Sequence, residues 1–349
     1  NAEGGLVVSE ESKASVFRLI EGGEADRIPV APPFQGYWTL GIEGIPVIES
    51  IRKPKLAAKA QMEMASRCGF DAMEASWDWL SPVEMFGCKV RVPVNGEIVT
   101  KTRLITGPES LKNLELPDPQ QDYRALSSAR SAELIVSKMG REMFLYSTIC
   151  CPFTLVGEMR GVEALLLDLI MQPDFAQDML EMATDVIQEY CRSICKTGVD
   201  GVILCDPTAS GSLVSPMEFR DYSRPYMKRC MEVVRLEGCV PMAHICGDTS
   251  ELMEIIADMG TSIFSLDSSV DPQRVTDHVR KRMTFLGNVN SQMMFKRSPQ
   301  EAFAESVKCI ERAENMRLIL GLGDDIVTGT PVDNIRAMRN ASDSFLSKE

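Results

Sequence analysis

The chain has 349 residues, of which 44% are hydrophobic and 25% are charged, as is typical of a water-soluble globular protein. No apolar run is long enough to cross a bilayer, which argues against an integral membrane protein. The net charge of −13 disfavours nucleic acid as a partner, because binding a phosphate backbone requires clustered Lys and Arg. These features predict a cytoplasmic protein, and the length is compatible with one large α/β barrel.

The N-terminal stretch NAEGGLVVSEESKAS lacks the basic and apolar regions of a secretion signal, so we expect a soluble start. We predict that residues 1–25 form an extension and a helix before the first strand. The eleven cysteines are odd in number and scattered through apolar segments. This pattern indicates reduced thiols of the cytosol rather than a disulfide framework.

Short apolar segments alternate with longer segments of helical periodicity along the chain. Such segments are expected for a parallel sheet that helices cover on its outer side. Eight of them are predicted as strands: Ile28–Phe34, Phe70–Ser76, Met143–Ile149, Val199–Asp206, Cys239–Cys246, Ser262–Asp267, Met283–Val289 and Arg317–Gly323. Eight strand and helix units predict a (β/α)8 TIM barrel, and we assign residues 1–349 to one domain.

Residues 88–116 form an insert between the second and third predicted strands. KVRVPVNGEIVTKTRLI alternates in polarity and carries Asn95-Gly96 at its centre, which predicts a β-hairpin flap. Further along, QPDFAQD predicts the start of a long amphipathic helix over residues 172–196, with Pro173 in its first turn. Ser215, followed by Pro216 and Glu218, predicts another helix start with a serine cap.

Polar residues follow several of the predicted strands. Because catalytic groups of a TIM barrel lie at the carboxyl ends of its strands, these residues are expected to share one rim. They are Gln35, Asp78, Cys150, Asp206, His244, Cys246, Asp267, Asn288, Asn290, Asp324 and Asp325. The rim is therefore the predicted place of the chemistry.

His244 and Cys246 are two residues apart at a strand end and could offer one nitrogen and one sulfur ligand to zinc. A third ligand must come from elsewhere, and Asp324 in GLGDD is the first candidate, followed by Glu158 and Asp78. Spacing alone leaves an alternative open. In that alternative Cys246 is a buried thiol, His244 is a hydrogen-bonded core residue, and the two aspartates cap a helix.

Two carboxylates near the rim are further candidates. Asp206 could bind a substrate hydroxyl or amine, or cap the Gly-Ser loop that follows it. Asp78, between Trp77 and Trp79, could contact substrate, and the two tryptophans could equally belong to the core.

The first loop carries aromatic residues that could form a wall of the substrate site. Gln35, Tyr37 and Trp38 are the candidates, although a surface hydrophobic contact would explain them nearly as well. Asn288 is expected to tie its strand to the neighbouring loop, a role that could be purely structural. His278 lies among charged residues and is expected to be solvated.

Several motifs together resemble the uroporphyrinogen decarboxylase superfamily over residues 26–338. They are DRIPV, CGFDAMEASWDWL, PFTLVGEMRG, DPTASGSLVSPMEFRDYSRPYMK, HICGDTSELMEIIADMG, LGNVNSQMM and GTPVDNIRAM. The resemblance implies a TIM barrel with one of two chemistries. One is cofactor-free decarboxylation of a tetrapyrrole, and the other is zinc-dependent methyl transfer between corrinoid proteins and thiols such as coenzyme M.

The sequence departs from the decarboxylase branch at three places. The arginine-rich segment after the first strand reads PPFQGYW here, so the cations that would pair tetrapyrrole carboxylates are missing from it. Asp78 aligns with the essential aspartate of that branch. However, its tyrosine falls at Glu158 and its late histidine falls at Asp324.

The methyltransferase branch carries an H-x-C motif and a later cysteine as third zinc ligand. His244 and Cys246 match that motif, whereas Asp324 stands where the cysteine is expected. A carboxylate donates less strongly than a thiolate and leaves zinc harder, which suits the activation of an oxygen or amine leaving group. The resemblance therefore implies a zinc-dependent methyltransferase for a thiol, ether or amine.

The implied partner is a corrinoid protein that carries the cobamide, and the chain could form a homodimer. The implied metal ligands are His244, Cys246 and Asp324. Glu158 is a fourth ligand or a proton donor, Asp78 and Asp206 orient substrate, and the first-loop residues line the wall. The alternatives are decarboxylase-like chemistry on a tetrapyrrole and a non-catalytic corrinoid or tetrapyrrole binder.

Overall fold

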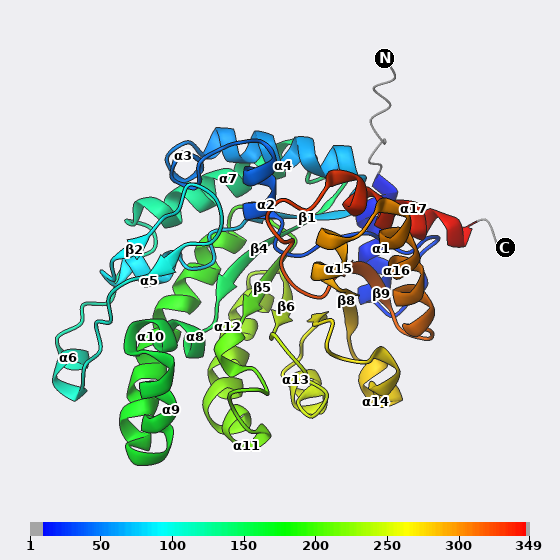
Figure 1. Ribbon diagram of the computed structural model, residues 1–349. Helices are drawn as coiled ribbons and strands as arrows, with labels where there is room; N and C mark the ends of the chain where they lie inside the picture. The colour runs from blue at the N-terminus through cyan, green and yellow to red at the C-terminus, as the bar shows by residue number, and fades with distance from the viewer. Residues whose placement is uncertain (1–9, 347–349) are drawn as a thin grey trace.

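The computed structural model describes residues 10–346, and its centre is a curled parallel sheet surrounded by helices (Figure 1). The predicted extension before residue 10 lies outside the described residues. The seven strands of the sheet are hydrogen-bonded in the order β1-β4-β5-β6-β7-β8-β9. Their bounds are β1 (Ala72–Ser76), β4 (Phe144–Cys150), β5 (Gly201–Cys205), β6 (Val240–His244), β7 (Ile263–Leu266), β8 (Thr284–Val289) and β9 (Leu318–Leu322).

The first predicted strand closes the barrel but is much shorter than expected. Val30 forms an isolated parallel bridge to Leu320 of β9, and its carbonyl accepts a hydrogen bond from the backbone N–H of Asp71 beside β1. The ladder cannot continue because Pro32 and Pro33 follow and have no N–H to donate. Seven strands and this bridging segment thus form the predicted TIM-barrel fold, with one strand position reduced to a bridge.

Helices on the outside of the sheet connect consecutive strands. The main ones are α1 (Glu10–Ile20), α2 (Gly36–Ile42), α3 (Val47–Arg52), α4 (Pro54–Cys68), α5 (Ser81–Met85), α7 (Tyr123–Met139), α8 (Pro152–Arg160), α9 (Val162–Met171), α10 (Pro173–Cys195), α12 (Arg224–Leu236), α13 (Met253–Asp258), α14 (Asp277–Arg280), α15 (Ser291–Lys296), α16 (Pro299–Arg312) and α17 (Val332–Leu346). Among residues 10–346, no helix combines the length and the apolar character needed to span a bilayer.

Both helix starts predicted from the sequence are confirmed. The long helix α10 spans Pro173–Cys195 and packs its apolar face on the barrel. The capping box at Ser215 is present, because the Ser215 hydroxyl accepts from the Glu218 N–H and the Glu218 carboxylate accepts from the Ser215 N–H. This cap starts α11 (Pro216–Glu218), and a π-helical turn over Phe219–Ser223 joins it to α12.

The amino-terminal end of the barrel is closed by α1. Val16 and Leu19 of this helix are buried against inward-facing residues of the strands, and Phe17 meets Phe144 edge-on with ring centroids 5.4 Å apart. The strand residues that face the barrel axis at this level are all apolar: Ala72, Phe144, Ile203, Met242, Ile263, Leu286 and Ile319. This end of the barrel is therefore a packed core.

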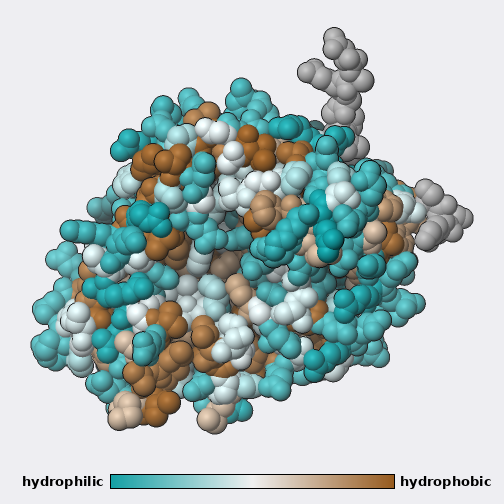
Figure 2. Space-filling model, in the orientation of Figure 1, coloured by the Kyte–Doolittle hydropathy of each residue, from teal (hydrophilic) through white to brown (hydrophobic). Residues whose placement is uncertain are grey.

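The insert over residues 88–116 contains the predicted hairpin, with a shorter ladder than the alternation indicates. β2 (Val90–Arg91) pairs antiparallel with β3 (Val99–Thr100), and Gly96 takes a φ of 90° at the turn. The short helix α6 (Pro108–Lys112) follows at the outer end (Figure 1). Space filling of the same view shows a hollow near the centre of this face (Figure 2).

Candidate metal centre

Strand alternation brings three polar side chains to one level at the carboxyl end of the sheet. The register pairs Cys205 of β5 with His244 of β6, and His244 with Ser265 of β7. Successive side chains of a strand point to opposite faces, so residues in register on neighbouring strands point the same way. Because Ile203 and Met242 belong to the inner core, the residues two positions later also face the barrel axis.

His244, Cys246 and Asp324 form a group of potential metal ligands. One donor atom from each lies within 4.8 Å of the other two. His244 Nε2 is 3.4 Å from Cys246 Sγ and 3.9 Å from Asp324 Oδ1. Ligand atoms at the corners of a zinc tetrahedron stand about 3.3–3.8 Å apart when the metal–ligand bonds are about 2.0–2.3 Å. The nitrogen, sulfur and oxygen donors therefore suit zinc in kind, and the two distances from His244 Nε2 lie within or slightly above the spacing of a zinc tetrahedron.

The imidazole of His244 is held by contacts that leave Nε2 directed at the other two ligands. Its Nδ1 lies 3.0 Å from the buried Ser265 hydroxyl, and the ring of Phe34 meets it edge-on at 4.8 Å. Phe34 adopts a left-handed φ of 52°, an uncommon conformation for a bulky residue. Burial lowers the pKa of His244, which favours the neutral imidazole that metals bind.

The other two ligands differ in exposure. Cys246 is half-buried, and burial raises the pKa of its thiol, so metal binding would have to displace the thiol proton. The Asp324 carboxylate is about half exposed and accepts a hydrogen bond from the Asp325 N–H. The alternative in which the two aspartates cap a helix does not hold, because the next helix starts only at Val332.

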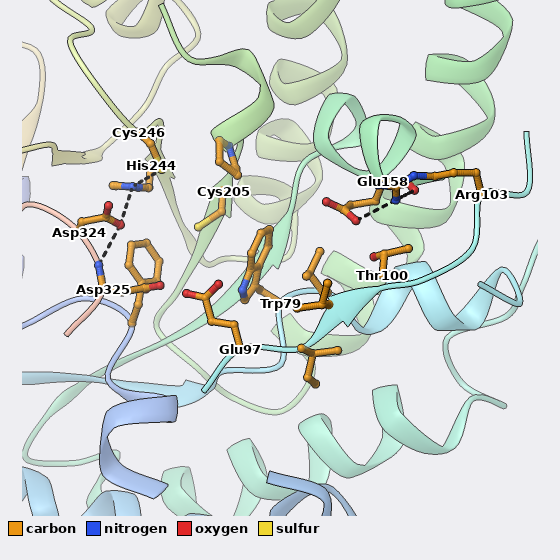
Figure 3. Close-up of a pocket in the computed structure, with 15 residues that line it drawn as sticks. Trp79, Glu97, Thr100, Arg103, Glu158, Cys205, His244, Cys246, Asp324 and Asp325 are labelled. Atoms are coloured by element: carbon orange, nitrogen blue, oxygen red, sulfur yellow. Dashed lines mark hydrogen bonds and ion pairs between the residues drawn. The ribbon is translucent and has the colours of Figure 1, made fainter. Parts of the chain in front are cut away.

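The ligand group lies in the wall of a cavity of about 440 Å³ at the barrel mouth (Figure 3). This volume lies in the range of small-molecule sites. The cavity is lined by Phe34, Trp79, Leu80, Glu97, Ile98, Val99, Thr100, Arg103, Glu158, Cys205, Pro207, His244, Cys246, Asp324 and Asp325. A neighbouring cavity of about 490 Å³ shares Phe34, Glu97, Asp324 and Asp325 with it.

The hairpin insert supplies one side of this cavity, which the sequence reasoning did not foresee. Glu97 and Arg103 both come from the insert and line the cavity with the three residues after Glu97. Arg103 Nη1 donates to the Glu158 carbonyl at 2.5 Å and lies 3.4 Å from Glu158 Oε2. Nothing in the local sequence predicts these contacts, because the insert and α8 meet only through the tertiary fold.

Asp325 and Glu97 form a carboxyl pair beside the ligand group. Burial, followed by the hydrogen bond with Glu97, raises the pKa of Asp325 well above its ordinary value. Burial and this contact both disfavour the charged form of the Asp325 carboxyl group. Deeper in the barrel, Glu74 of β1 is buried between the Thr148 hydroxyl and the Gly36 N–H, and burial raises its pKa to about 7. The sequence reasoning passed over both Glu74 and Glu97.

Glu158 and Asp206 end in different environments. Glu158 lines the cavity from α8 but lies outside the ligand group, with Arg103 beside it (Figure 3).

Asp206 is fully buried and does not line the cavity. Its two carboxyl oxygens each accept a hydrogen bond at 2.6 Å, from Thr154 of α8 and from Ser223 of the π-helical turn. Burial raises its pKa to about 6. Asp206 thus links α8 to the π-helical turn through these two hydrogen bonds.

Asp78 is also placed away from the cavity. Its carboxylate accepts hydrogen bonds from Arg124 Nε at 2.8 Å and Nη2 at 2.5 Å, and Arg124 also donates to Glu84 at 2.7 Å. Asp78 and Arg124 are both buried. A buried guanidinium needs such a partner. Asp78 does not line the cavity, so its predicted contact with substrate has no counterpart there.

The candidate wall residues of the first loop are dispersed. Trp38 is fully buried and its indole N–H donates to the Thr330 carbonyl, so it belongs to the core. The Tyr37 hydroxyl accepts from the Ile98 N–H, and its ring lines the neighbouring cavity. Gln35 is buried without a side-chain partner among the described residues. Phe34 is the aromatic residue of this loop that reaches the cavity with the metal ligands.

Asn288 and His278 lie where the sequence analysis expected them. The Asn288 amide donates to the Asp267 and Val270 carbonyls, which ties β8 to the loop after β7. Asn288 does not line the cavity, so its predicted substrate contact has no counterpart there. His278 is exposed on α14, with a side chain about two-thirds accessible.

Comparison with known proteins places the chain among methyltransferases and decarboxylases. It is 25% identical over 283 residues to the methylcobamide:CoM methyltransferase MtbA of Methanosarcina mazei, covering 79% of this chain and 80% of the relative. It is 25% identical over 328 residues to a methylated-thiol–coenzyme M methyltransferase of the same organism, covering 90% of this chain and 84% of the relative. A uroporphyrinogen decarboxylase of Geobacter sp. is 23% identical over 292 residues, covering 81% of this chain and 83% of the relative.

The fold agrees with these relatives. A solved methyltransferase from Methanosarcina mazei superimposes with a TM-score of 0.87 over 96% of this chain and 98% of that chain, at 23% identity. The expected enzyme class, a methyltransferase, agrees with the names of these relatives. Residues 11–345 match the family described as Uroporphyrinogen decarboxylase (URO-D), and the chain therefore belongs to the uroporphyrinogen decarboxylase family.

Proposed function

We propose that this chain is a zinc-dependent methyltransferase that moves a methyl group between a corrinoid carried by a partner protein and a small thiol, ether or amine. The observation that carries the proposal is the convergence of the His244, Cys246 and Asp324 donor atoms on one wall of a cavity at the barrel mouth. Relatives that are named methylcobamide:CoM methyltransferases support the corrinoid part of the proposal.

The three ligands would hold the metal, and Ser265 and Phe34 would keep the imidazole in place. Bound there, zinc would act as a Lewis acid on the heteroatom of the substrate. Asp324 supplies a carboxylate where the resemblance leads us to expect a thiolate, which makes the site harder and favours oxygen or nitrogen. The reaction in the donor direction breaks one carbon–heteroatom bond and forms one carbon–cobalt bond, and the leaving atom of a neutral substrate takes up a proton.

Glu158 is the proposed source of that proton, since its carboxyl group lines the same cavity. Asp206 positions α8, which carries Glu158, through the hydrogen bond from Thr154. Asp78 holds the chain segment after β1 in place through its ion pair with Arg124. The next residue, Trp79, lines the cavity. In this proposal Asp78 and Asp206 act on the shape of the site, without touching the substrate.

The charge of the cavity argues against the decarboxylase alternative. Its lining includes four acidic side chains, Glu97, Glu158, Asp324 and Asp325, and one guanidinium, Arg103. A tetrapyrrole with many carboxylates needs cations to pair with, and like charges in a poorly solvated cavity repel it. A small substrate does not meet this obstacle.

The test is zinc stoichiometry on protein purified without chelator, for the wild type and for His244→Ala and Asp324→Ala. We expect about one zinc per chain in the wild type and a loss of zinc in both variants. His278→Ala is the matched control, because it removes the second histidine of the chain from an exposed helix and should retain the metal. Methyl transfer is then followed by the absorbance of cob(I)alamin with methylated amines and ethers, and of methylcobalamin with thiols.

A wild-type protein that takes up no zinc even when zinc is added would contradict the proposal. Full zinc content in Asp324→Ala would remove Asp324 from the ligand set and leave the site to His244, Cys246 and another donor.

A further inference from the structure

The cavity beside the ligand group is strongly acidic. Four of its lining side chains carry carboxyl groups, three of them besides the buried Asp325, and its guanidinium, Arg103, already has Glu158 as a partner at 3.4 Å. A divalent ion and a Cys246 thiolate together add only one positive charge, which leaves the lining net negative. A negative cavity with low-dielectric walls attracts cations and excludes anions.

Aromatic side chains form the other part of the lining. Trp79 lies in the cavity near Cys205 and Glu97 (Figure 3). The Trp79 backbone is fixed, since its N–H donates to Trp77 and its carbonyl accepts from Cys150. Phe34 lies at the metal-ligand end, against His244. Indole and phenyl faces carry partial negative charge and attract ammonium groups.

We propose that the small substrate of this cavity is a cation whose ammonium group lies against Trp79 and Glu97, beside the His244, Cys246 and Asp324 group. This inference rests on the proposed function for the reaction, and it adds the charge of the substrate. Two sources share the required chemistry. One is a methylated ammonium compound, whose carbon–nitrogen bond breaks to leave a neutral amine while the methyl group goes to cobalt, so that its nitrogen needs neither zinc nor a proton. The other is an aminothiol, whose sulfur loses its proton and accepts the methyl group from cobalt.

The same geometry disfavours an anionic thiol such as coenzyme M, 2-mercaptoethanesulfonate. Its sulfonate would find Arg103 in the lining, and binding there would displace the Glu158 carboxylate and leave it unpaired. This chain would therefore differ in substrate from the relatives that are named for coenzyme M.

The experiment is isothermal titration calorimetry with choline and with its neutral carbon isostere, 3,3-dimethylbutan-1-ol, on zinc-loaded and on metal-free protein. The two probes have nearly the same shape and differ by one charge. We expect choline to bind at least ~10-fold more tightly than the isostere. Glu97→Gln should weaken choline binding by about 5-fold and leave the isostere unchanged, because the exposed Glu97 contributes charge rather than packing.

One further variant tests the indole ring of Trp79, and another serves as the control for Glu97→Gln. Trp79→Leu should weaken choline binding by about 10-fold, with thermal unfolding as the check on folding. Glu115→Gln is the matched control, because Glu115 is an exposed glutamate of the same insert that does not line the cavity. Its choline affinity should equal that of the wild type.

A second titration distinguishes the two sources and tests the anion. Tighter binding of cysteamine than of choline to zinc-loaded protein would identify an aminothiol, and the reverse order would identify a methylated amine. Equal binding of choline and its isostere, absence of saturable choline binding, or tighter binding of 2-mercaptoethanesulfonate than of cysteamine would each overturn the inference.

Failure of this inference differs from failure of the proposed function. Protein that contains zinc and transfers methyl groups, yet prefers the sulfonate, retains the function and loses the inferred substrate charge. Protein that holds no zinc and transfers no methyl group, yet selects choline over its isostere with dependence on Glu97, loses the function and keeps the cation site.

Discussion

The two ends of the barrel are built from the same strands but from different side chains. At the amino-terminal end the inward positions are apolar, and α1 covers them with Val16 and Leu19. At the carboxyl end the positions two residues further along include Cys205, His244 and Ser265, and the first two of these line an open cavity. One end packs like a protein core, and the other keeps a polar cavity.

This difference teaches where stability and chemistry are located in the molecule. Close packing at the covered end stabilises the barrel, whereas the polar side chains around the open cavity at the mouth bury less apolar surface and contribute less to stability. Changes at the covered end should therefore alter unfolding and leave ligand binding intact. Changes at the mouth should do the opposite. Three experiments test this separation.

The largest effect is expected for Phe144→Ala at the covered end. Phe144 is fully buried among the inner core residues and against Phe17, so its removal should lower the free energy of unfolding by about 3–5 kcal/mol. Zinc content per folded chain should not change. Denaturant unfolding and metal analysis measure the two quantities, with Phe144→Leu as a milder control. A fall in zinc affinity comparable to the loss of stability would break the separation.

Glu74→Gln tests the level between the two ends. The pKa of Glu74 is raised to about 7 in the folded protein, above the ordinary value of 4.5, so the folded state binds the proton more readily. The sign follows from linkage: stability present at low pH is lost as the pH rises from about 4.5 to about 7, and the loss amounts to ~3 kcal/mol. Glutamine stays neutral, can accept from Gly36 and can donate to Thr148.

The variant should therefore lose less stability than the wild type over this pH range. Denaturant unfolding at several pH values between about 4.5 and about 7.5 measures the difference. Asp206→Asn is the comparison, since the pKa of Asp206 is raised to about 6 and its window lies at lower pH. Identical pH profiles for the wild type and Glu74→Gln would show that Glu74 does not retain its proton in the fold.

The smallest effect is expected for the removal of one hydroxyl group. Ser265→Ala removes the partner of His244 Nδ1 and should weaken zinc binding about 10- to 100-fold, because such a partner orients the ligand. Thr284→Val removes a hydroxyl that donates to Leu19 at the covered end, and should cost about 1 kcal/mol of stability.

The two variants together sharpen the comparison between the ends. Zinc affinity from chelator competition should change in Ser265→Ala alone, and the free energy of unfolding should change more in Thr284→Val. Equal zinc affinity in Ser265→Ala and the wild type would mean that the imidazole is oriented by Phe34 and the backbone.

Most strands and the two helix starts could be predicted because local patterns specify them. Seven of the eight predicted strands are present with small shifts at their ends, and the capping box at Ser215 is present. The segment Ile28–Phe34 was misjudged in length, because its hydrophobic pattern resembles a strand while Pro32 and Pro33 limit its ladder.

The candidate site was predictable in part. His244 and Cys246 are close in sequence, and the rule that barrel chemistry lies at strand ends brought Asp324 into consideration. Asp78 and Asp206 follow the same rule but face other partners, Arg124 in one case and Thr154 and Ser223 in the other. A position at a strand end does not say which way the side chain after it turns.

The sequence by itself determined the order of strands and helices, the acidic character of the chain and the H-x-C pair, since each depends on residue type or short spacing. Only the tertiary structure decided that Asp324 meets this pair, and that Glu97 and Arg103 of the insert complete the cavity. The physical reason is that contacts between distant segments depend on barrel closure and on side-chain packing, which no local pattern encodes.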